Sequence, residues 1–224
     1  MARRADEWPR LPEVTEPHPP RARRSWGKVA HSERYRRQRR DLLQAAGRLA
    51  GRKGYEGTRV ADIVAEAGLS KSTFYEHFAS KEDCFVELHR RTSAQMVQTA
   101  VDAAEANVHT GPYECLVAVI RAFVGYADRN PRLAEVFRAT FGETERVVQH
   151  QREENFRRVV HFFVTLGRRL GSSLDENELE LTSTILVRGV TDILGDLRRS
   201  PETLDDRLSQ IARIGCRAFV LPSP

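Results

Sequence analysis

The sequence is poor in cysteine, in long apolar runs and in lysine. The first two shortages argue against a disulfide-rich protein and a membrane-spanning protein, and the third draws attention to the few lysines present. Its three cysteines, Cys84, Cys115 and Cys216, are odd in number and far apart, which favours reduced thiols over a disulfide framework. No apolar run approaches the roughly 20 residues of a membrane-spanning helix, and charges and prolines stand where a signal peptide would be apolar. These absences predict a soluble, cytoplasmic chain with no membrane partner. Its 224 residues are enough for one large domain or two small ones.

Lysine is scarce, because the chain has 4 lysines against 32 arginines. The basic charge is also unevenly distributed. Residues 1–81 hold 18 Lys and Arg against 10 Asp and Glu, a net charge of +8, whereas residues 82–224 hold 18 against 21, a net charge of −3. This division predicts that the front of the chain contacts a polyanion and that the back does not.

The motifs of common enzyme classes are absent from the sequence. It contains no glycine-rich phosphate loop, no HExxH, no GxSxG and no CxxC pair. Cys84 and His89 would face different directions on one helix, and adjacent Glu153 and Glu154 would diverge in the same way. We therefore expect no enzymatic activity, no catalytic residue, no metal site and no cofactor. A helical protein with an unrecognised activity is one alternative.

Helical periodicity dominates the chain, and no segment of convincing length has the period of a strand, so the predicted fold class is all-α. Residues 1–31 are rich in proline and arginine and poor in aliphatic residues, which predicts a disordered basic arm. A helix is expected from about Ser32 until Gly54 ends it, with Tyr55 beyond as an apolar anchor.

Short helices follow one another closely between residues 58 and 85. Thr58 is expected to cap the first, and Gly68 to end it in the left-handed conformation. Ser70 and Ser80 are expected to cap the next two helices. These caps and the helix-ending glycine predict a tight turn between two short helices.

The helix after Ser70 has two inward apolar residues, Phe74 and Phe78, four positions apart. Its other face is polar and consists of Lys71, Ser72, Thr73, Tyr75 and His77. Two helices joined by a tight turn that contains glycine, the second short and rich in donors, are typical of a helix-turn-helix. Hydroxyls and a lysine at the start of the helix would then reach base edges, while Tyr75, His77 and the helix N-termini would bind phosphates.

The run "AGLSKSTFYEHFASKE" resembles the DNA-binding signature of the tetracycline-repressor (TetR) family, and the similarity covers about residues 34–90. The Gly, the Tyr, the His-Phe pair and the Ser-Lys all occur at that family's offsets, whereas Val64 and Ala50 depart from its pattern. The resemblance implies a three-helix helix-turn-helix DNA-binding domain at 32–80 and a helical effector-binding and dimerisation domain at 81–224. It also implies that Thr58, Arg59, Tyr75, His77 and Lys81 hold the DNA backbone, and that Lys71, Ser72 and Thr73 face bases.

Several of these residues have a plainer interpretation. Tyr75 and His77 could be merely solvated, and Lys71 and Lys81 could be ordinary surface lysines. The arginines of the arm could bind phosphates or the minor groove, or could belong to an idle tail. A non-specific DNA-binding protein acting through the basic arm is therefore a further alternative function.

For the larger domain, the resemblance implies a pocket for a small-molecule effector whose occupancy changes the separation of two recognition helices. The candidate wall residues are Phe123, Tyr126, Phe137, Phe141, Phe156 and Phe163. Packed core is the competing interpretation of the same aromatic residues. An apolar wall with few polar groups, such as Tyr126 or His161, would favour an uncharged or lipophilic effector.

The last two helices carry apolar stripes, formed by Leu186, Val190, Ile193 and Leu197 and by Leu204, Leu208, Ile211 and Phe219. The resemblance implies that these helices pair with their copies in a homodimer, whereas packing within one chain explains the same stripes from sequence alone. A two-fold dimer would read two half-sites of a palindromic operator in double-stranded DNA. The predicted function is a sequence-specific transcriptional regulator, a repressor that a small lipophilic effector releases from its operator.

Overall fold

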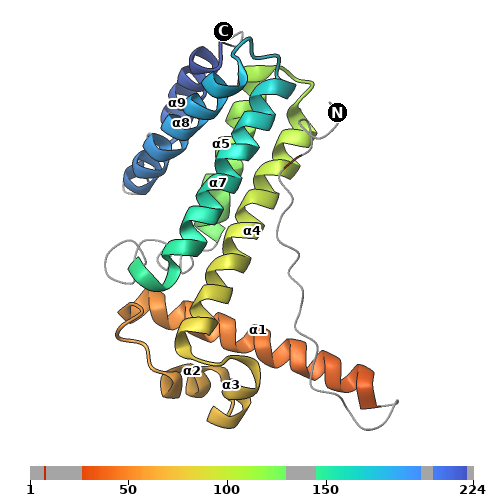
Figure 1. The fold of residues 1–224 in the computed structure, drawn as a ribbon, viewed down its shortest axis with the longest axis vertical. Coiled ribbons are helices and arrows are strands. Elements are labelled where there is room, and N and C mark those ends of the chain that lie inside the picture. Colours follow the sequence, from red (N-terminus) through yellow and green to blue (C-terminus); the bar gives the residue numbers. More distant parts are fainter. Residues whose placement is uncertain (1–7, 9–26, 130–144, 198–203, 221–224) are drawn as a thin grey trace. The chain divides into compact units, whose positions relative to one another are not determined.

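The structure is a computed structural model that describes residues 8, 27–129, 145–197 and 204–220 (Figure 1). All regular elements in these residues are helices, which confirms the predicted all-α class. They are α1 (Gly27–Lys53), α2 (Val60–Ala67), α3 (Lys71–His77), α4 (Lys81–Asn107), α5 (Pro112–Arg129), α7 (Glu145–Arg169), α8 (Glu176–Leu197) and α9 (Leu204–Ala218). None of these described helices combines the length and the apolar character that crossing a membrane requires.

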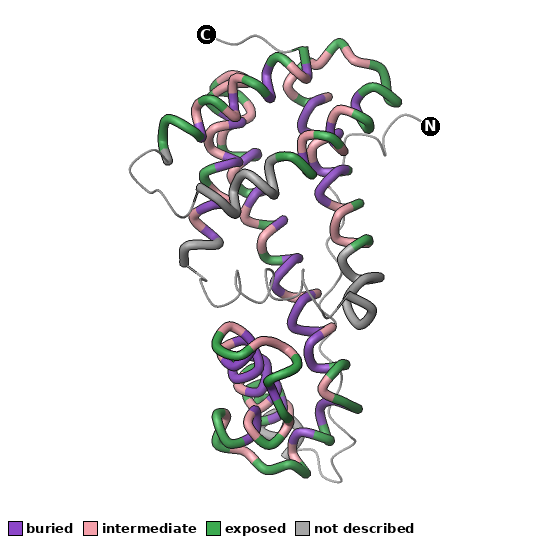
Figure 2. The backbone as a smooth tube through the Cα atoms, turned by 90° about the vertical axis from the view of Figure 1, so that its left-hand side faces the viewer, coloured by how far each residue is buried: buried purple, intermediate pink, exposed green. Residues whose placement is uncertain are grey.

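The chain forms two compact units, which we call the N-terminal unit (residues 12–93 and 130–152) and the C-terminal unit (residues 1–11, 94–129 and 153–224). The boundary between them falls within α4, between residues 93 and 94. The sequence pattern predicts it earlier, after residue 80. The reason is that the first turns of α4 carry Cys84, Phe85 and Leu88, which belong to the core of the N-terminal unit. Buried positions recur along the helices of both units (Figure 2).

Helix α1 begins at Gly27, before the start that the sequence predicts at Ser32. No proline or glycine separates Lys28 from Ser32, so nothing in the sequence opposes helix there. With the exception of Trp8, residues 1–26 lie outside the described residues, and the predicted disorder of the arm stays a prediction. At its other end α1 stops before Gly54, which has a φ of 73°.

The core of the N-terminal unit is formed by one face of α1 together with residues of α2, α3 and α4. From α1 come Leu42, Leu43, Ala45, Ala46, Leu49 and Ala50. The α2 residues Ile63 and Val64 pack against this face, and α3 adds Phe74, which is fully buried. Tyr55 packs edge-on against Phe85 with ring centroids 4.9 Å apart, as expected of an apolar anchor. The burial of these residues fixes how α2 and α3 stand on α1.

The turn between α2 and α3 has the predicted form. Gly68 adopts the left-handed conformation, with φ 65° and ψ 33°, and its N–H donates to the carbonyl of Ala65. The Ser70 hydroxyl accepts a hydrogen bond from the Thr73 N–H at 3.0 Å and caps α3. The Ser80 hydroxyl likewise accepts from the Asp83 N–H at 3.1 Å at the start of α4. Both predicted serine caps are therefore confirmed.

The predicted cap at Thr58 is wrong, because Arg59 is the N-cap of α2. Thr58 is fully buried and its hydroxyl donates to the carbonyl of Gly54 at 2.7 Å. The carboxylate of Asp62 instead accepts from the Arg59 N–H at 3.0 Å. The Thr58 hydroxyl thus bonds the preceding turn, while Asp62 bonds the backbone of the N-cap residue of α2.

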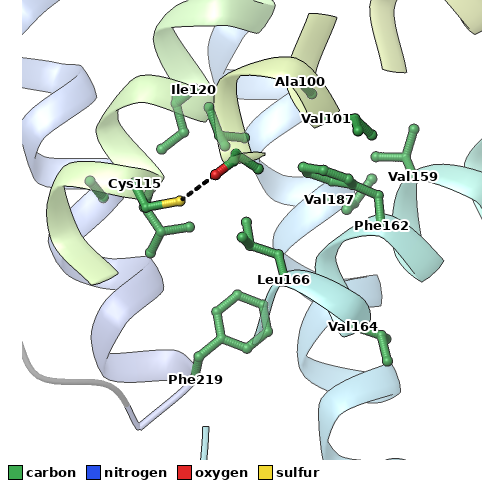
Figure 3. Packing of buried hydrophobic residues seen from close by; sticks show 14 of the residues in the cluster. Ala100, Val101, Cys115, Ile120, Val159, Phe162, Val164, Leu166, Val187 and Phe219 are labelled. Atoms are coloured by element: carbon green, nitrogen blue, oxygen red, sulfur yellow. Dashed lines mark hydrogen bonds between the residues drawn. The ribbon is translucent and has the colours of Figure 1, made fainter. Parts of the chain in front are cut away.

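The core of the C-terminal unit is built from α4, α5, α7, α8 and α9. Figure 3 shows Phe162 and Leu166 of α7 among Val101, Val159, Val187 and Phe219. Helix α5 packs along α9, and the Cys115 thiol of α5 points to the Ala104 carbonyl of α4 at 3.9 Å. All three cysteines are buried and free, which agrees with the prediction of reduced thiols. Burial raises the pKa of Cys84 to about 12 and that of Cys115 to about 11.

Candidate nucleic-acid interface

Helix α3 presents a polar surface because two phenylalanines hold its opposite side in the core. Phe74 and Phe78 are both buried, with ring centroids 5.5 Å apart. Opposite them, Lys71, Ser72 and Tyr75 are exposed, and Tyr75 exposes 58% of its surface. An apolar side of two residues is enough to fix a short helix while its other groups stay available to a ligand.

Tyr75, Lys71 and Ser72 are therefore placed as the sequence predicts. The Tyr75 ring packs edge-on against Phe74 at 5.4 Å, so the ring is supported although it is largely exposed. Arg59 is also exposed, at the start of α2. Thr73 is half-buried, with its hydroxyl 2.9 Å from that of Ser70, and so belongs partly to the cap of α3.

The prediction that His77 lies on the exposed polar face is wrong. Its side chain is buried, its ring lies 4.1 Å from that of Tyr35, and neither ring nitrogen has a hydrogen-bond partner among the described residues. Burial, with a smaller contribution from the nearby Arg39 guanidinium, lowers the pKa of His77 from its ordinary 6.5 to about 4. The ring is thus neutral at physiological pH and packs between helices. Thr58 is the other buried member of the predicted set, and it has no exposed surface.

Lys81 is engaged within the protein. Its ammonium group donates to the Tyr55 carbonyl at 3.1 Å and lies 3.8 Å from the centroid of the Tyr55 ring. These contacts join the start of α4 to the loop after α1. Lys81 therefore differs from Lys71, which stands exposed on α3.

Arg39 is a structural residue of this interface that the sequence pattern does not reveal. Its guanidinium is buried, donates to the backbone carbonyl of His77 and lies 4.2 Å from the centroid of the Phe78 ring. It also faces the Glu87 carboxylate at 3.9 Å. The residue thereby ties the end of α3 to α1 and α4. In the sequence it is one of several arginines at the start of α1, and no local signal separates it from the exposed ones.

The acidic groups of α2 are neutralised by basic groups of α1. Glu66 accepts from Arg48 at 2.7 Å and from Arg52 at 2.8 Å, and these hydrogen bonds lower the pKa of its carboxyl. Asp62 accepts from Lys53 at 2.7 Å, and this hydrogen bond lowers its pKa in the same way. Carboxylates that are paired in this way repel an approaching polyanion less than free ones would.

Two of the predicted effector-site residues, Phe137 and Phe141, fall outside the described residues, and the other four are described. Phe123 of α5 and Phe163 of α7 are stacked with centroids 6.4 Å apart, and both pack against the core of the C-terminal unit.

The other two predicted wall residues have polar neighbours, and one of them, Phe156, packs against the same core. The guanidinium of Arg188 lies 4.3 Å from the centroid of the Phe156 ring. Tyr126 is buried, its hydroxyl lies 3.4 Å from the Gln95 side-chain oxygen, and burial raises its pKa to about 12. The structure thus places Phe123, Phe156 and Phe163 against one core, an arrangement that both packed core and a lipophilic pocket allow.

The described members of the predicted stripes of α8 and α9 face inward. Leu208 and Phe219 are buried, and Leu186 and Ile211 pack against the core of the C-terminal unit. The side chains of Val190, Ile193, Leu197 and Leu204 lie outside the described part. Among the described side chains of these helices, the exposed large apolar ones are instead Leu181 and Ile185 of α8 and Ile214 of α9, with exposed fractions of 62%, 63% and 56%. The sequence shows them as apolar residues but does not indicate which stripe the fold buries.

The family profile described as "Bacterial regulatory proteins, tetR family" matches residues 42–88, which run from α1 into α4. Among curated proteins, the chain is 27% identical over 120 residues to the HTH-type transcriptional repressor AcnR of Corynebacterium diphtheriae, which covers 51% of this chain and 57% of AcnR. It is 28% identical over 169 residues to the nucleoid occlusion factor SlmA of Edwardsiella ictaluri, over 70% of this chain and 82% of SlmA. The chain spans about half the length of the AcnR repressors that it matches.

Solved structures share the fold. A putative TetR-family transcriptional regulator from Mesorhizobium loti superposes with a TM-score of 0.66 at 22% identity, over 85% of this chain and 99% of that one. A transcriptional regulator from Rhodococcus superposes with a TM-score of 0.68 at 18% identity, over 83% and 99%. The capped α3 on its phenylalanine anchors, the profile match at the same residues and the shared fold agree with one another. Residues 42–88 of this chain match the tetR family of bacterial regulatory proteins, and its fold is similar to that of solved transcriptional regulators.

Proposed function

We propose that this protein is a sequence-specific DNA-binding transcriptional regulator, a repressor that acts in the cytoplasm as a homodimer. The observation that carries the proposal is helix α3, which is capped by Ser70 and anchored by Phe74 while it exposes Lys71 and Tyr75. An α-helix with a donor-rich face fits the major groove, where lysine and hydroxyl groups bind base edges. The repressor role is supported by the relatives that carry that word in their names.

The contacts with DNA are divided between two kinds of residue in this proposal. Lys71, Ser72 and Thr73, at the N-terminal end of α3, face bases, while Arg59, Tyr75 and Lys81 hold phosphates. Lys81 would have to exchange its bond to the Tyr55 carbonyl for a phosphate contact. His77 and Thr58 act from inside the unit, because their side chains are buried and can only position the helices that carry the contacts.

Dimerisation is proposed through α8 and α9, at the exposed Leu181, Ile185 and Ile214 rather than at the buried stripes. A small lipophilic effector would bind in the C-terminal unit near Phe123, Phe156 and Phe163 and favour the conformation that binds DNA poorly. Two α3 helices related by a two-fold axis would read the half-sites of a palindromic operator.

The test is selection of random double-stranded DNA by the purified protein at near-physiological salt, followed by sequencing of the retained DNA. We expect an enriched palindrome. On that operator, Lys71→Ala should weaken binding about tenfold, in line with the cost of one lost base contact. Lys53→Ala is the comparison variant, because it removes the same charge from the same unit and also leaves Asp62 unpaired. A purely electrostatic effect would make it at least as harmful as Lys71→Ala, whereas a base contact of Lys71 makes it less harmful.

Retention of DNA without an enriched sequence would contradict the proposal and favour a non-specific binder that uses the basic arm. Equal losses for Lys71→Ala and Lys53→Ala would show that only the net charge matters. In that case the affinity should fall steeply with salt on every sequence alike.

A further inference from the structure

Trp8 lies on helix α7 of the C-terminal unit, far in the sequence from the residues that it contacts. Its indole ring is stacked on the ring of Phe162, with centroids 5.2 Å apart and planes inclined by 24°. The guanidinium carbon of Arg169 lies 4.3 Å from the centroid of the same indole. Phe162 and Arg169 are about two turns apart on α7, so Trp8 lies along one face of that helix.

The indole is not fully satisfied in this position. Its Nε1–H is buried and has no hydrogen-bond partner among the described residues, and the residue as a whole is half-buried. Tryptophan N–H groups usually find a partner when buried, because an unsatisfied donor costs free energy. The described residues therefore stack on the aromatic ring of Trp8 but provide no hydrogen-bond acceptor for its N–H group.

The sequence around Trp8 offers little to hold it in place. The flanking run "RRADEWPRLPE" consists mainly of charged residues and prolines, and Trp8 is its one aromatic residue. Burial of one aromatic side chain contributes only about 2–3 kcal/mol, so the indole can leave its position at a low free energy. When Trp8 leaves, the Phe162 ring loses the indole that stacks on it, and an aromatic surface becomes available.

This surface continues toward two of the predicted effector-site residues. Phe162 packs edge-on against Phe163 with centroids 5.1 Å apart, and Phe163 is stacked with Phe123 of α5. Aromatic rings thus run in contact from Trp8 through α7 to α5. The exposed Arg169 at the edge favours an electron-rich ring, since a guanidinium is attracted to the face of such a ring.

We propose that the α7 face formed by Phe162 and Arg169 is a binding site for a planar, electron-rich aromatic ligand, and that Trp8 fills it as a tethered competitor. This gives the effector of the proposed function a chemical class. The inference rests on that function only for its regulatory consequence, because ligand binding is measured without DNA. A tethered competitor lowers the apparent affinity of a free ligand by the fraction of time for which the site is open.

The test uses the full chain with Trp26→Phe, in which Trp8 is the remaining tryptophan, labelled with 5-fluorotryptophan. Its single fluorine resonance reports whether the ring is stacked on Phe162. The probe is unlabelled indole, and we expect it to move the resonance toward the position that the label has in urea.

Calorimetry then compares the affinity for indole of the parent, Trp8→Ala and Trp26→Phe proteins. The last is the matched control, since it replaces the other tryptophan of the arm.

We expect Trp8→Ala to bind indole about tenfold more tightly than the parent, which corresponds to a site that Trp8 fills about nine-tenths of the time. Trp26→Phe should bind as the parent does, and adding Arg169→Gln to Trp8→Ala should weaken binding. Equal affinity of parent and Trp8→Ala with an unmoved resonance would overturn the proposal, as would no binding to Trp8→Ala at millimolar indole. DNA selection with the same Trp26→Phe protein is a separate readout, so an enriched operator alongside failed indole binding overturns the ligand site alone.

Discussion

At the scale of single residues, Tyr75 is the exposed aromatic residue of α3, with 58% of its surface accessible. Its ring rests on Phe74, so its position is fixed before DNA arrives. We expect Tyr75→Ala to weaken operator binding by about 1–3 kcal/mol, the range of a good side-chain contact with DNA, and to leave the melting temperature unchanged. The measurements are a fluorescence-anisotropy titration on the selected operator and a thermal melt.

Tyr75→Phe separates the hydroxyl from the ring in the same experiment. Equal losses for the Phe and Ala variants identify the hydroxyl as the contact, whereas a loss only for Ala identifies the ring. Full affinity in both variants would show that Tyr75 is merely solvated.

His77 is expected to make the stability of the N-terminal unit depend on pH. Its pKa is about 4 in the folded protein against an ordinary 6.5, so between these values the unfolded chain binds more protons than the folded one. The free energy of unfolding therefore falls on acidification, by about 2 kcal/mol from pH 7.5 to 5. Urea unfolding at several pH values measures this change in the free energy of unfolding.

His77→Gln is the control for this effect, because it removes the titrating group and keeps a side chain of similar length. The variant should lose the part of the pH dependence that lies between pH 6.5 and 4. If its pH dependence equals that of the parent, the effect belongs to other groups.

At the scale of elements, the turn between α2 and α3 depends on the backbone conformation of Gly68 and not on space around it. Its φ is 65° and a Cβ placed there would meet nothing within 4 Å. We expect Gly68→Ala to lower the free energy of unfolding by about 1 kcal/mol, because a residue with a Cβ is strained in this conformation. Circular dichroism in urea measures the loss.

Gly68→Asn is the matched variant, since asparagine tolerates the left-handed conformation better than alanine does. It should lose clearly less than Gly68→Ala. Equal losses in the two variants would mean that the turn adopts another conformation in solution.

Helix α8 carries a second prediction at this scale. Leu181 and Ile185 are four residues apart and both largely exposed, so they form an apolar strip on one face. If this strip pairs with its copy, Ile185→Glu buries a charge in the interface and shifts the protein to monomer, with dimer dissociation increased by at least about tenfold. Analytical ultracentrifugation measures the mass.

Glu180→Gln is the control, because it changes one charge at an exposed position of the same helix away from this strip. It should leave the oligomeric state as it is. An unchanged mass for Ile185→Glu would place the interface elsewhere.

At the scale of the whole molecule, the three buried thiols report on the two units separately. Cys84 belongs to the core of the N-terminal unit, whereas Cys115 and Cys216 belong to that of the C-terminal unit. Burial raises the pKa of all three thiols, so alkylation by iodoacetamide at pH 8 should be at least about a hundredfold slower in the native protein than in urea.

Mass spectrometry over graded urea concentrations then assigns each modification. We expect Cys115 and Cys216 to become reactive together and Cys84 in a transition of its own, because each unit has its own core. Separate transitions for Cys115 and Cys216 would show that α5 and α9 do not unfold as one unit.

The amino-acid sequence by itself determined the helical class, the turn at Gly68, the caps at Ser70 and Ser80 and the inward side of α3. Each of these depends on residues within a few positions of one another, where capping groups, left-handed glycine and helical period act locally. The exposure of Lys71, Ser72 and Tyr75 followed from the same local pattern, and so did the resemblance to the tetR-family signature.

The tertiary structure alone decided which polar and apolar residues are buried. His77 reads as a surface residue in sequence but lies inside, because Tyr35 contacts it across the fold. Thr58 is buried as well, although the bond of its hydroxyl to the Gly54 carbonyl is local. Arg39 joins helices through His77 and Glu87, far along the chain. The described stripe residues of α8 and α9 lie in or against the core, whereas Leu181, Ile185 and Ile214 are exposed. Trp8 contacts α7 across more than half of the chain. Contacts between distant segments set these outcomes, and local periodicity carries no information about which distant surface a helix will meet.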